Sequence, residues 1–327
     1  MKYIILSPMS KKQRGALLLA ALCLVWWLLD SFVFWKEVAE QRYVLHTLAE
    51  IRVLCHSRQQ GRQAINTAFA KMKELEEKFN YFDPGSELSR INQNAFRQEM
   101  PLSGDMNAIL TLALAGSEIS GGTFDITITP ISRLYGFGTE QKQKPDQRNI
   151  QNQMQGVGWQ KVRLDSQKQT VRLLHSRTQL DLGGIAKGYA VDQAVETLQR
   201  HGIRHALVNA GGNIFALGQK RGKPWRIAIR DPRAVEKTLQ VFELSDEACA
   251  TSGDYEQYFV ADGQRYSHIF NPQTGRPANL ENELASVTVI ADSAARADLL
   301  STACFVLGVE KSSIFPEKKF FYKANAD

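Results

Sequence analysis

The sequence predicts an α+β domain with much antiparallel sheet, preceded by one N-terminal apolar helix. Two observations predict the domain. Short strand-like runs occur between a few helical stretches, and no long linker, repeat or low-complexity tract interrupts them. The third observation is that the one long apolar run is confined to the start of the chain. We therefore expect a basic tip and membrane anchor over residues 1–36 and a single domain over residues 37–327.

The N-terminal segment is first basic and then apolar. Four lysines and arginines precede any acid and supply most of the net charge of +6, which arises from 40 basic and 34 acidic residues. Because the rest of the chain carries little net charge, no nucleic-acid partner is indicated. Residues 15–35, interrupted only by Asp30, supply the roughly 20 mostly apolar residues that a transmembrane helix needs.

The basic flank predicts the orientation of this helix. Positive residues favour the cytoplasmic side, so we expect a single pass through the bacterial inner (cytoplasmic) membrane with the domain on the periplasmic, extracytoplasmic side. Trp26, Trp27 and Trp35 fit the interfacial enrichment of aromatic residues. A cleaved signal peptide is the alternative, although no small-x-small cleavage site follows the apolar run. A buried soluble helix is a third interpretation.

The domain itself shows helical spacing first and strand-like runs later. Apolar residues at helical spacing predict helices over 63–82 and 106–119, and two further helices over 185–201 and 293–307. Asp262-Gly263 predicts a hairpin turn. The polar segment 140–160 is expected to be a surface loop. Strand-like runs occupy residues 161–164, 170–174, 205–209, 225–229, 257–261 and 286–291.

The first candidate site motif is Gly122-Thr123-Phe124-Asp125, followed by apolar residues in alternation. Phe124, Ile126 and Ile128 predict a half-buried strand that Pro130 ends. Asp125 lies at the start of that strand. Its carboxylate could contact a ligand, or it could serve only the local structure.

The second motif runs from Asp181 through Gly183-Gly184 into a predicted helix. Here we expect a strand that ends at Asp181 and a helix that opens near Ile185. A helix N-terminus offers free N–H groups and partial positive charge, which suit a phosphate. Lys187 in the first turn opposes the helix dipole, so a functional role competes evenly with a solvated lysine in a tight turn.

Two further positions carry groups that could act chemically. His268 ends a strand before a Pro/Gly-rich turn and could be a general base near neutral pH, although a lone histidine is more often structural. Asp298 and Thr302 are spaced i and i+4 on one helix face, so both oxygens could reach one cation. A polar stripe on a helix is the alternative.

Taken in order, these segments resemble the ApbE family of FAD:protein FMN transferases. The matching blocks include Asp181-Leu182-Gly183-Gly184-Ile185-Ala186-Lys187-Gly188, Ala250-Thr251-Ser252-Gly253-Asp254-Tyr255 and His268-Ile269-Phe270-Asn271-Pro272. The resemblance covers residues 43–320. It implies a T-fold-like α+β domain that binds FAD and Mg²⁺, with Mn²⁺ as another possible metal. It also implies that FMN is attached to a threonine or serine of a partner flavoprotein, with release of AMP.

The resemblance also implies roles for individual residues. His268 corresponds to the histidine that helps to activate the attacking hydroxyl, and Gly184, Asp298 and Thr302 correspond to the metal ligands. The acceptor would be a subunit of a membrane respiratory complex or another extracytoplasmic flavoprotein. Six residues fall where the family contacts FAD: Thr123, Phe124, Asp125, Asp181, Lys187 and Phe270.

Some positions depart from the family pattern, and other functions stay open. Residues 46–50 replace the usual Met-Gly-Thr, Phe82 stands where a tyrosine is common, and Asn271 replaces a common aspartate. The first alternative is an FAD pyrophosphatase, in which water replaces the protein hydroxyl. The second is a membrane-tethered flavin-binding or assembly protein without turnover.

Overall fold

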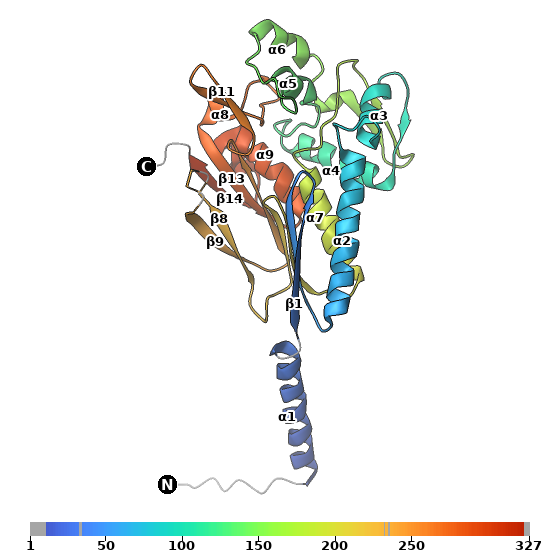
Figure 1. Ribbon diagram of the computed structural model, residues 1–327, viewed down its shortest axis with the longest axis vertical. Coiled ribbons are helices and arrows are strands. Elements are labelled where there is room, and N and C mark those ends of the chain that lie inside the picture. Colours follow the sequence, from blue (N-terminus) through green and yellow to red (C-terminus); the bar gives the residue numbers. More distant parts are fainter. Residues whose placement is uncertain (1–10, 33–34, 232, 235, 324–327) are drawn as a thin grey trace.

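The computed structural model describes residues 11–32, 35–231, 233–234 and 236–323. One helix stands apart from a domain in which helices cover a twisted sheet (Figure 1). The helices are α1 (Lys11–Phe32), α2 (Arg58–Phe79), α3 (Glu87–Asn94), α4 (Gly104–Ile119), α5 (Thr129–Leu134), α6 (Gln147–Met154), α7 (Ala186–Arg200), α8 (Asn279–Asn282) and α9 (Ala294–Lys311).

The strands form one large sheet and three small ones. The large sheet has the order β1-β2-β6-β7-β10-β13-β14, and each neighbouring pair is antiparallel. The α+β prediction with antiparallel sheet is therefore confirmed. The large sheet contains β1 (Lys36–Val44), β2 (Thr47–Cys55), β6 (His205–Ala210), β7 (Asn213–Leu217), β10 (Glu247–Gly253), β13 (Leu284–Ala291) and β14 (Lys318–Lys323).

The small sheets lie around this one. One sheet has the order β3-β5-β4, and two are hairpins, β8-β9 and β11-β12. The β11-β12 hairpin turns at Asp262-Gly263, as predicted, and both residues have positive φ. The strands are β3 (Met100–Pro101), β4 (Val162–Asp165), β5 (Thr170–Leu173), β8 (Trp225–Arg230), β9 (Thr238–Leu244), β11 (Tyr258–Ala261) and β12 (Gln264–Ser267).

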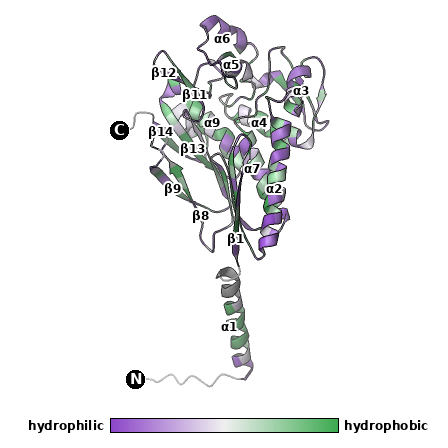
Figure 2. Ribbon diagram, in the orientation of Figure 1, coloured by the Kyte–Doolittle hydropathy of each residue, from purple (hydrophilic) through white to green (hydrophobic). Residues whose placement is uncertain are grey.

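Alternation along the strands divides the core between the two faces of the sheet. In β10, Ala248 and Ala250 pack with the main core under α2, α7 and α9, whereas Cys249 packs with the β8-β9 hairpin on the other face. Figure 2 shows hydrophobic residues on the sheet and on the helices that cover it, with polar residues toward the outside. The helical layer thus holds α7 and α9 against the sheet and against each other.

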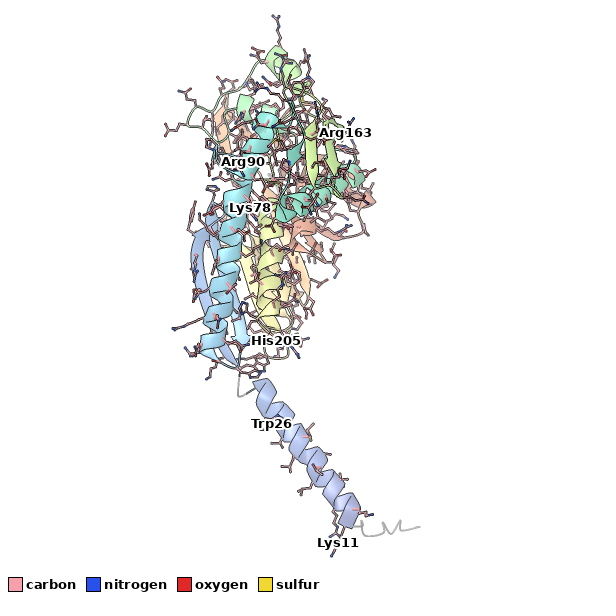
Figure 3. The ribbon with its side chains drawn as sticks, turned by 90° about the vertical axis from the view of Figure 1, so that its right-hand side faces the viewer. Lys11, Trp26, Lys78, Arg90, Arg163 and His205 are labelled. Atoms are coloured by element: carbon pink, nitrogen blue, oxygen red, sulfur yellow. The ribbon has the colours of Figure 1, made fainter. Side chains whose placement is uncertain are left out.

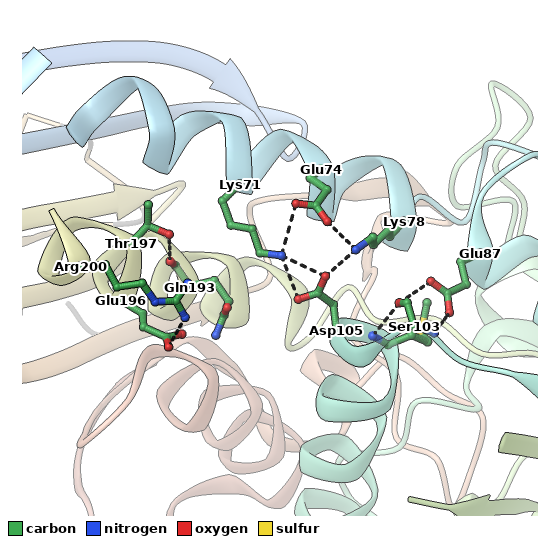
Figure 4. A network of polar contacts seen from close by, with 11 residues as sticks. Lys71, Glu74, Lys78, Glu87, Ser103, Asp105, Gln193, Glu196, Thr197 and Arg200 are labelled. Atoms are coloured by element: carbon green, nitrogen blue, oxygen red, sulfur yellow. Dashed lines mark hydrogen bonds and ion pairs between the residues drawn. The ribbon is translucent and has the colours of Figure 1, made fainter. Parts of the chain in front are cut away.

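An ion-pair network fixes α2 to α4 at the edge of this layer (Figure 4). The ammonium groups of Lys71 and Lys78 lie 3.0 and 2.5 Å from the Asp105 carboxylate, and Glu74 bridges the two lysines. Burial tends to raise the pKa of Asp105, but the two lysines outweigh it and leave this pKa lowered. The network supports the fold and lies outside the candidate site.

Two local predictions for the segment between residues 124 and 160 were wrong. Residues 124–128 form turns instead of a strand, because the Asp125 carboxylate accepts hydrogen bonds from the Thr127 N–H and hydroxyl, at 2.8 and 2.6 Å. Pro130 then lies in the first turn of α5, where its missing N–H costs nothing. The predicted loop 140–160 contains α6, which Asp146 caps by accepting from the Asn149 N–H at 2.7 Å.

Helix α1 extends from the end of the domain near His205, with Lys11 at its far end (Figure 3). Its leucines between positions 17 and 24, Val25 and Trp26 are exposed. Within the described part of the chain, no helix combines the length and apolar character needed to cross a membrane. The predicted span 15–35 includes positions 33–34, which lie outside the described residues, so the transmembrane helix stays a prediction.

Candidate active site

One cavity brings together the ten candidate site residues that the sequence predicted. Its volume is about 320 Å³, and it lies where the tip of the β1-β2 hairpin, the start of α7, the middle of α9 and the end of β12 meet. These segments are far apart in the sequence, so only the fold assembles them. The predicted residues that line the cavity are Thr123, Phe124, Asp125, Asp181, Gly184, Lys187, His268, Phe270, Asp298 and Thr302.

The Thr123–Asp125 turn forms one wall of the cavity. Besides its bonds to Thr127, the Asp125 carboxylate accepts the Trp159 N–H at 2.8 Å, so both of its oxygens hold protein donors. Burial raises the pKa of Asp125 despite these bonds. Thr123 donates its hydroxyl to the Ser120 carbonyl at 3.0 Å. In this geometry the turn shapes the wall, and Asp125 fixes the shape.

The second motif enters the cavity through a turn and a helix start. The Asp181 carboxylate accepts the Gly183 N–H at 2.8 Å, and α7 begins at Ala186, close to the predicted position. The predicted strand before it is absent: the backbone N–H of Asp181 instead bonds the Ile126 carbonyl at 2.8 Å, across to the Thr123–Asp125 turn. Long-range pairing of this kind leaves no local sequence pattern.

Lys187 is the cation that the carboxylates of the cavity surround. Burial favours the neutral amine, but the carboxylates of Asp298, Glu256 and Asp181 outweigh this effect and leave the pKa of Lys187 raised. For Asp298 and Glu256, burial raises the pKa and the Lys187 charge opposes it. Lys187 therefore stays an ammonium ion at neutral pH, in reach of an anionic ligand.

Asp298 and Thr302 project from α9 as the spacing predicts. Asp298 is 5% exposed, and its Oδ2 accepts the Gly188 N–H of α7 at 3.0 Å. The Thr302 hydroxyl lies 3.3 Å from Ser252 Oγ. A methyl group added at Gly184 would lie 3.3 Å from Thr302 Oγ1, so the two residues are neighbours. The structure thus groups the three predicted metal ligands.

This donor set suits a hard cation. One carboxylate, one hydroxyl and one backbone carbonyl are all oxygen donors, and Mg²⁺ commonly takes few protein ligands and completes its shell with water and substrate phosphate. Among the described residues, no hydrogen bond uses Asp298 Oδ1, which leaves that oxygen available. The described residues contain no group of three or more His, Cys, Asp or Glu that could hold a metal by themselves. The residues present fit Mg²⁺ only together with a ligand that supplies further oxygens.

His268 sits at the end of β12 with one ring nitrogen engaged. The Gln257 carbonyl accepts the His268 backbone N–H at 3.1 Å and lies 3.2 Å from Nδ1. A carbonyl only accepts, so this contact assigns the proton to Nδ1 and leaves Nε2 as an acceptor. Burial, with Lys187 adding to it, lowers the pKa of His268 to about 4, so the ring is neutral at pH 7.

Aromatic rings form the wall next to His268. Phe270 is buried, with ring centroids 4.8 Å from Tyr135 and 5.7 Å from Phe137. This cluster gives the cavity an apolar surface beside its charged one. A ligand with a flat ring system and a phosphate would match both parts.

Several cavity residues were missed in the sequence. Glu256 and Gln257 follow the block that ends at Tyr255, and no motif marked them. Their segment is fixed by buried Asp254, which pairs with Arg233 at 3.0 Å and with Arg265 at 3.5 Å. The only signal in the sequence was that the block carrying Asp254 matched the family.

Fold and cavity together define an α+β protein with an active-site cavity lined by carboxylates, hydroxyls, a lysine and two histidines. The sequence model of the ApbE family matches residues 45–320, which is most of the chain. The chain therefore belongs to the ApbE family, and the resemblance drawn from its motifs is confirmed.

Named relatives support the same family. A Haemophilus influenzae protein named FAD:protein FMN transferase is 37% identical over 260 residues, covering 76% of this chain and 74% of its own length. One with the same name from Treponema pallidum is 33% identical over 315 residues, covering 87% and 86%. Their names give the activity of those proteins.

Solved structures agree with the fold. The crystal structure of the ApbE protein from Thermotoga maritima superposes with a TM-score of 0.80 at 33% identity, covering 88% of this chain and 94% of that one. The Pseudomonas stutzeri flavinyl transferase ApbE, in its apo form, gives a TM-score of 0.79 at 31% identity, covering 88% and 91%. The α+β architecture is thus that of ApbE proteins.

Proposed function

We propose that this chain is an FAD:protein FMN transferase. The observation that carries the proposal is that ten residues from positions 123 to 302 line one shared cavity and place an ammonium, carboxylates, a neutral imidazole and an aromatic wall together. Relatives at 33–37% identity bear this name. The substrates would be FAD and a threonine or serine hydroxyl of a partner protein, and the products FMN-protein and AMP.

In the proposed reaction the hydroxyl oxygen attacks the phosphorus on the FMN side of the pyrophosphate. The new P–O bond joins FMN to the protein as the bond to the AMP phosphate breaks. His268 Nε2 accepts the hydroxyl proton, and the Gln257 carbonyl holds the ring in the tautomer that can do so. AMP leaves with the electron pair of the broken bond, and no redox change occurs at the flavin.

Lys187 and the α7 N-terminus would bind the phosphates. The Lys187 ammonium and the partial positive charge of the helix N-terminus both favour negative charge, although the Ala186 and Gly188 N–H groups are already bonded to the Leu182 carbonyl and to Asp298. Phe270 and its aromatic neighbours would hold the ring system of the ligand away from water. Binding of the ligand at both its phosphates and its ring system would orient the pyrophosphate toward His268. This orientation would lower the entropic cost of reaching the transition state.

Mg²⁺, or Mn²⁺ in its place, would be held by Asp298, Thr302 and the Gly184 carbonyl. When bound there it would supply charge neutralisation to the pyrophosphate and to the departing AMP. The Gly188 N–H keeps one Asp298 oxygen oriented, so the other stays directed to the cavity.

To test the proposal, the full chain in detergent is incubated with FAD, Mg²⁺ and a candidate acceptor. The candidate acceptors are flavoprotein subunits of respiratory complexes. Intact mass would record a gain of one FMN on the acceptor, and chromatography would record AMP in equal amount. AMP and free FMN without any mass gain would support the FAD pyrophosphatase instead. FAD binding with neither product would support a non-catalytic flavin-binding or assembly protein.

We also propose that helix α1 tethers the domain to the inner membrane, with the domain on the periplasmic side. The support is the basic tip, the apolar run and the exposed leucines of α1. Removal of residues 1–36 should give a folded domain, 37–327, that binds FAD and no longer sediments with membranes. Equal sedimentation of both forms would reject the tether.

A further inference from the structure

Lysines and arginines gather at the opposite end of the domain from the cavity. The antiparallel register places the start of β1, the end of β2, the start of β6 and the end of β7 side by side there. Figure 3 shows His205, the first residue of β6, at this end and beside α1. We call this end the base; its segments are residues 35–37, 56–58, 202–205, 218–224 and 245–247.

The base is basic, and the other end of the domain is not. The base carries six lysines and arginines against three acids, whereas the connections 45–46, 80–86, 211–212 and 254–257 at the cavity end carry three acids and no lysine or arginine. Lys220 is paired with Glu37 at 3.1 Å. In the part of the chain that the structure describes, no ion pair engages the other five cations, all of which are exposed: Lys36, Arg58, Arg204, Arg221 and Lys223.

A tight turn displays two of these cations. The Lys220 N–H donates to the Lys223 carbonyl at 2.7 Å, and the Lys223 N–H donates to the Lys220 carbonyl at 3.2 Å. Arg221 and Gly222 form the tip, both with positive φ. Two-residue turns of this kind favour Asn-Gly or Asp-Gly, and an arginine at positive φ is uncommon. A cation kept there against the preference of the backbone indicates a role for its charge.

Chain connectivity places the base next to α1. Three residues separate Phe32, the last residue of α1, from Lys36, so the two lie within about 14 Å of each other whatever path the chain takes. The Trp35 ring packs on the base, with its centroid 4.3 Å from that of His56 and 5.2 Å from that of His205. Tryptophan is enriched at the membrane–water interface. When α1 spans the membrane, as proposed above, the base therefore lies at the level of the lipid headgroups.

We propose that the base binds the headgroups of anionic phospholipids; this inference rests on the membrane tether proposed above. Several lysines and arginines next to a membrane anchor act together in attracting anionic lipid. The β1-β2 hairpin runs from the base to its tip, Leu45-His46, which lines the cavity. Since β1 has nine residues, lipid binding at the base would hold the domain upright with its cavity about 30 Å from the headgroups.

The test places the full chain, through α1, in nanodiscs of phosphatidylcholine alone and in nanodiscs of equal parts phosphatidylcholine and phosphatidylglycerol. Hydrogen–deuterium exchange is then followed in peptides from both ends of the domain. Peptides that contain residues 202–205 and 218–224 should exchange at least about fivefold more slowly with phosphatidylglycerol, and high salt should remove the difference. Peptides that contain residues 45–46 and 254–257 should exchange equally in both nanodiscs.

Two triple variants separate the base from charge in general. The base variant should exchange at the same rate in both nanodiscs; it is Arg204→Gln, Arg221→Gln, Lys223→Gln. The matched control removes the same charge from exposed positions outside the base and should keep the lipid difference; it is Arg97→Gln, Arg148→Gln, Arg163→Gln.

Each other outcome overturns a definite part. Equal exchange of the wild-type base in both lipids overturns the base proposal alone, because a chain that has entered both nanodiscs is tethered. A base variant that keeps the lipid difference shows that these three cations do not bind the headgroups. Slower exchange at the cavity end instead of the base would mean that the other end of the domain meets the membrane. A full chain that enters neither nanodisc rejects the tether, and the base proposal with it.

Discussion

Gly188→Ala tests how closely α7 and α9 must approach to build the site. A Cβ at position 188 would lie 2.6 Å from the carbonyl carbon of Ala294, 2.8 Å from Ala295 Cα and nearer still to the Ala294 oxygen. All three are backbone atoms, which no rotamer change can move. The helices would have to separate, and the hydrogen bond from the Gly188 N–H to Asp298 would be lost.

The expected loss of stability in Gly188→Ala is the sum of the overpacking cost and the cost of the lost hydrogen bond. Overpacking in a close-packed interior costs about 1–3 kcal/mol, and a lost hydrogen bond to a buried charged group costs about 1.5–3 kcal/mol. We therefore expect a loss of about 2.5–6 kcal/mol in the free energy of unfolding, a large share of the roughly 5–15 kcal/mol typical of proteins. Because Lys187 and Asp298 would shift with the helices, AMP release should fall by about 100-fold.

Urea unfolding followed by tryptophan fluorescence measures the first effect, and AMP release from FAD measures the second. Gly104→Ala is the control, since a Cβ at this helical position meets nothing within 4 Å. It should change stability by no more than about 1 kcal/mol, in the stabilising direction. If Gly188→Ala unfolds within about 1 kcal/mol of wild type, the close helix contact does not hold in solution.

Three further predictions concern the metal site, His268 and the anchor of the Gln257 segment. Asp298→Ala should abolish metal-dependent AMP release, while Thr302→Ala should weaken it less because only a neutral oxygen is lost. AMP release is measured over a Mg²⁺ titration. If Asp298→Ala releases AMP as fast as wild type does, Asp298 is not part of the site. His268→Ala should slow FMN transfer by about 10²–10⁴ without weakening FAD binding. The pKa of His268 is lowered to about 4, so the ring becomes protonated, and transfer slows, only as the pH falls toward 4. A decline centred near pH 6.5 in a pH–rate profile would contradict this. Asp254→Asn should slow transfer and shift the ¹⁵N signals of the His268 ring, because the Gln257 segment loses its anchor; unchanged signals would argue against this role.

The parts of the site that the sequence predicted are those with local signals. The i, i+4 spacing of Asp298 and Thr302 places both on one face of α9 whatever that helix packs against. The glycines before Ile185 mark the start of α7 because the chain has to turn there. The Asp262-Gly263 turn is predicted because this residue pair tolerates the positive φ that a tight hairpin turn requires, and both residues adopt it. Where local geometry determines the structure, the pattern predicts it.

The parts that could not be predicted depend on contacts between distant segments. Phe124, Ile126 and Ile128 alternate like a strand, but the Asp125 carboxylate bonds Thr127 and Trp159 and bends the chain into turns. Glu256 reaches the cavity only because Asp254 pairs with two arginines from other hairpins. Neither arrangement changes the spacing of apolar residues, so neither leaves a trace in a single sequence.

The unfavourable position of Lys187 explains what the site requires of its ligand. A lysine in the first turn of a helix opposes the dipole by about 0.3–1 kcal/mol, and the carboxylates of Asp181, Glu256 and Asp298 offset this cost. Three carboxylates around one ammonium leave the cavity net negative when all are ionised, which repels a pyrophosphate. An anionic ligand therefore needs additional positive charge, and oxygen donors at Asp298, Thr302 and Gly184 are suited to a divalent cation that arrives with it. On this reasoning FAD should bind the chain more tightly with Mg²⁺ than with EDTA in equilibrium dialysis. Equal affinity in both would mean that Lys187 and the helix N-terminus alone balance the phosphates.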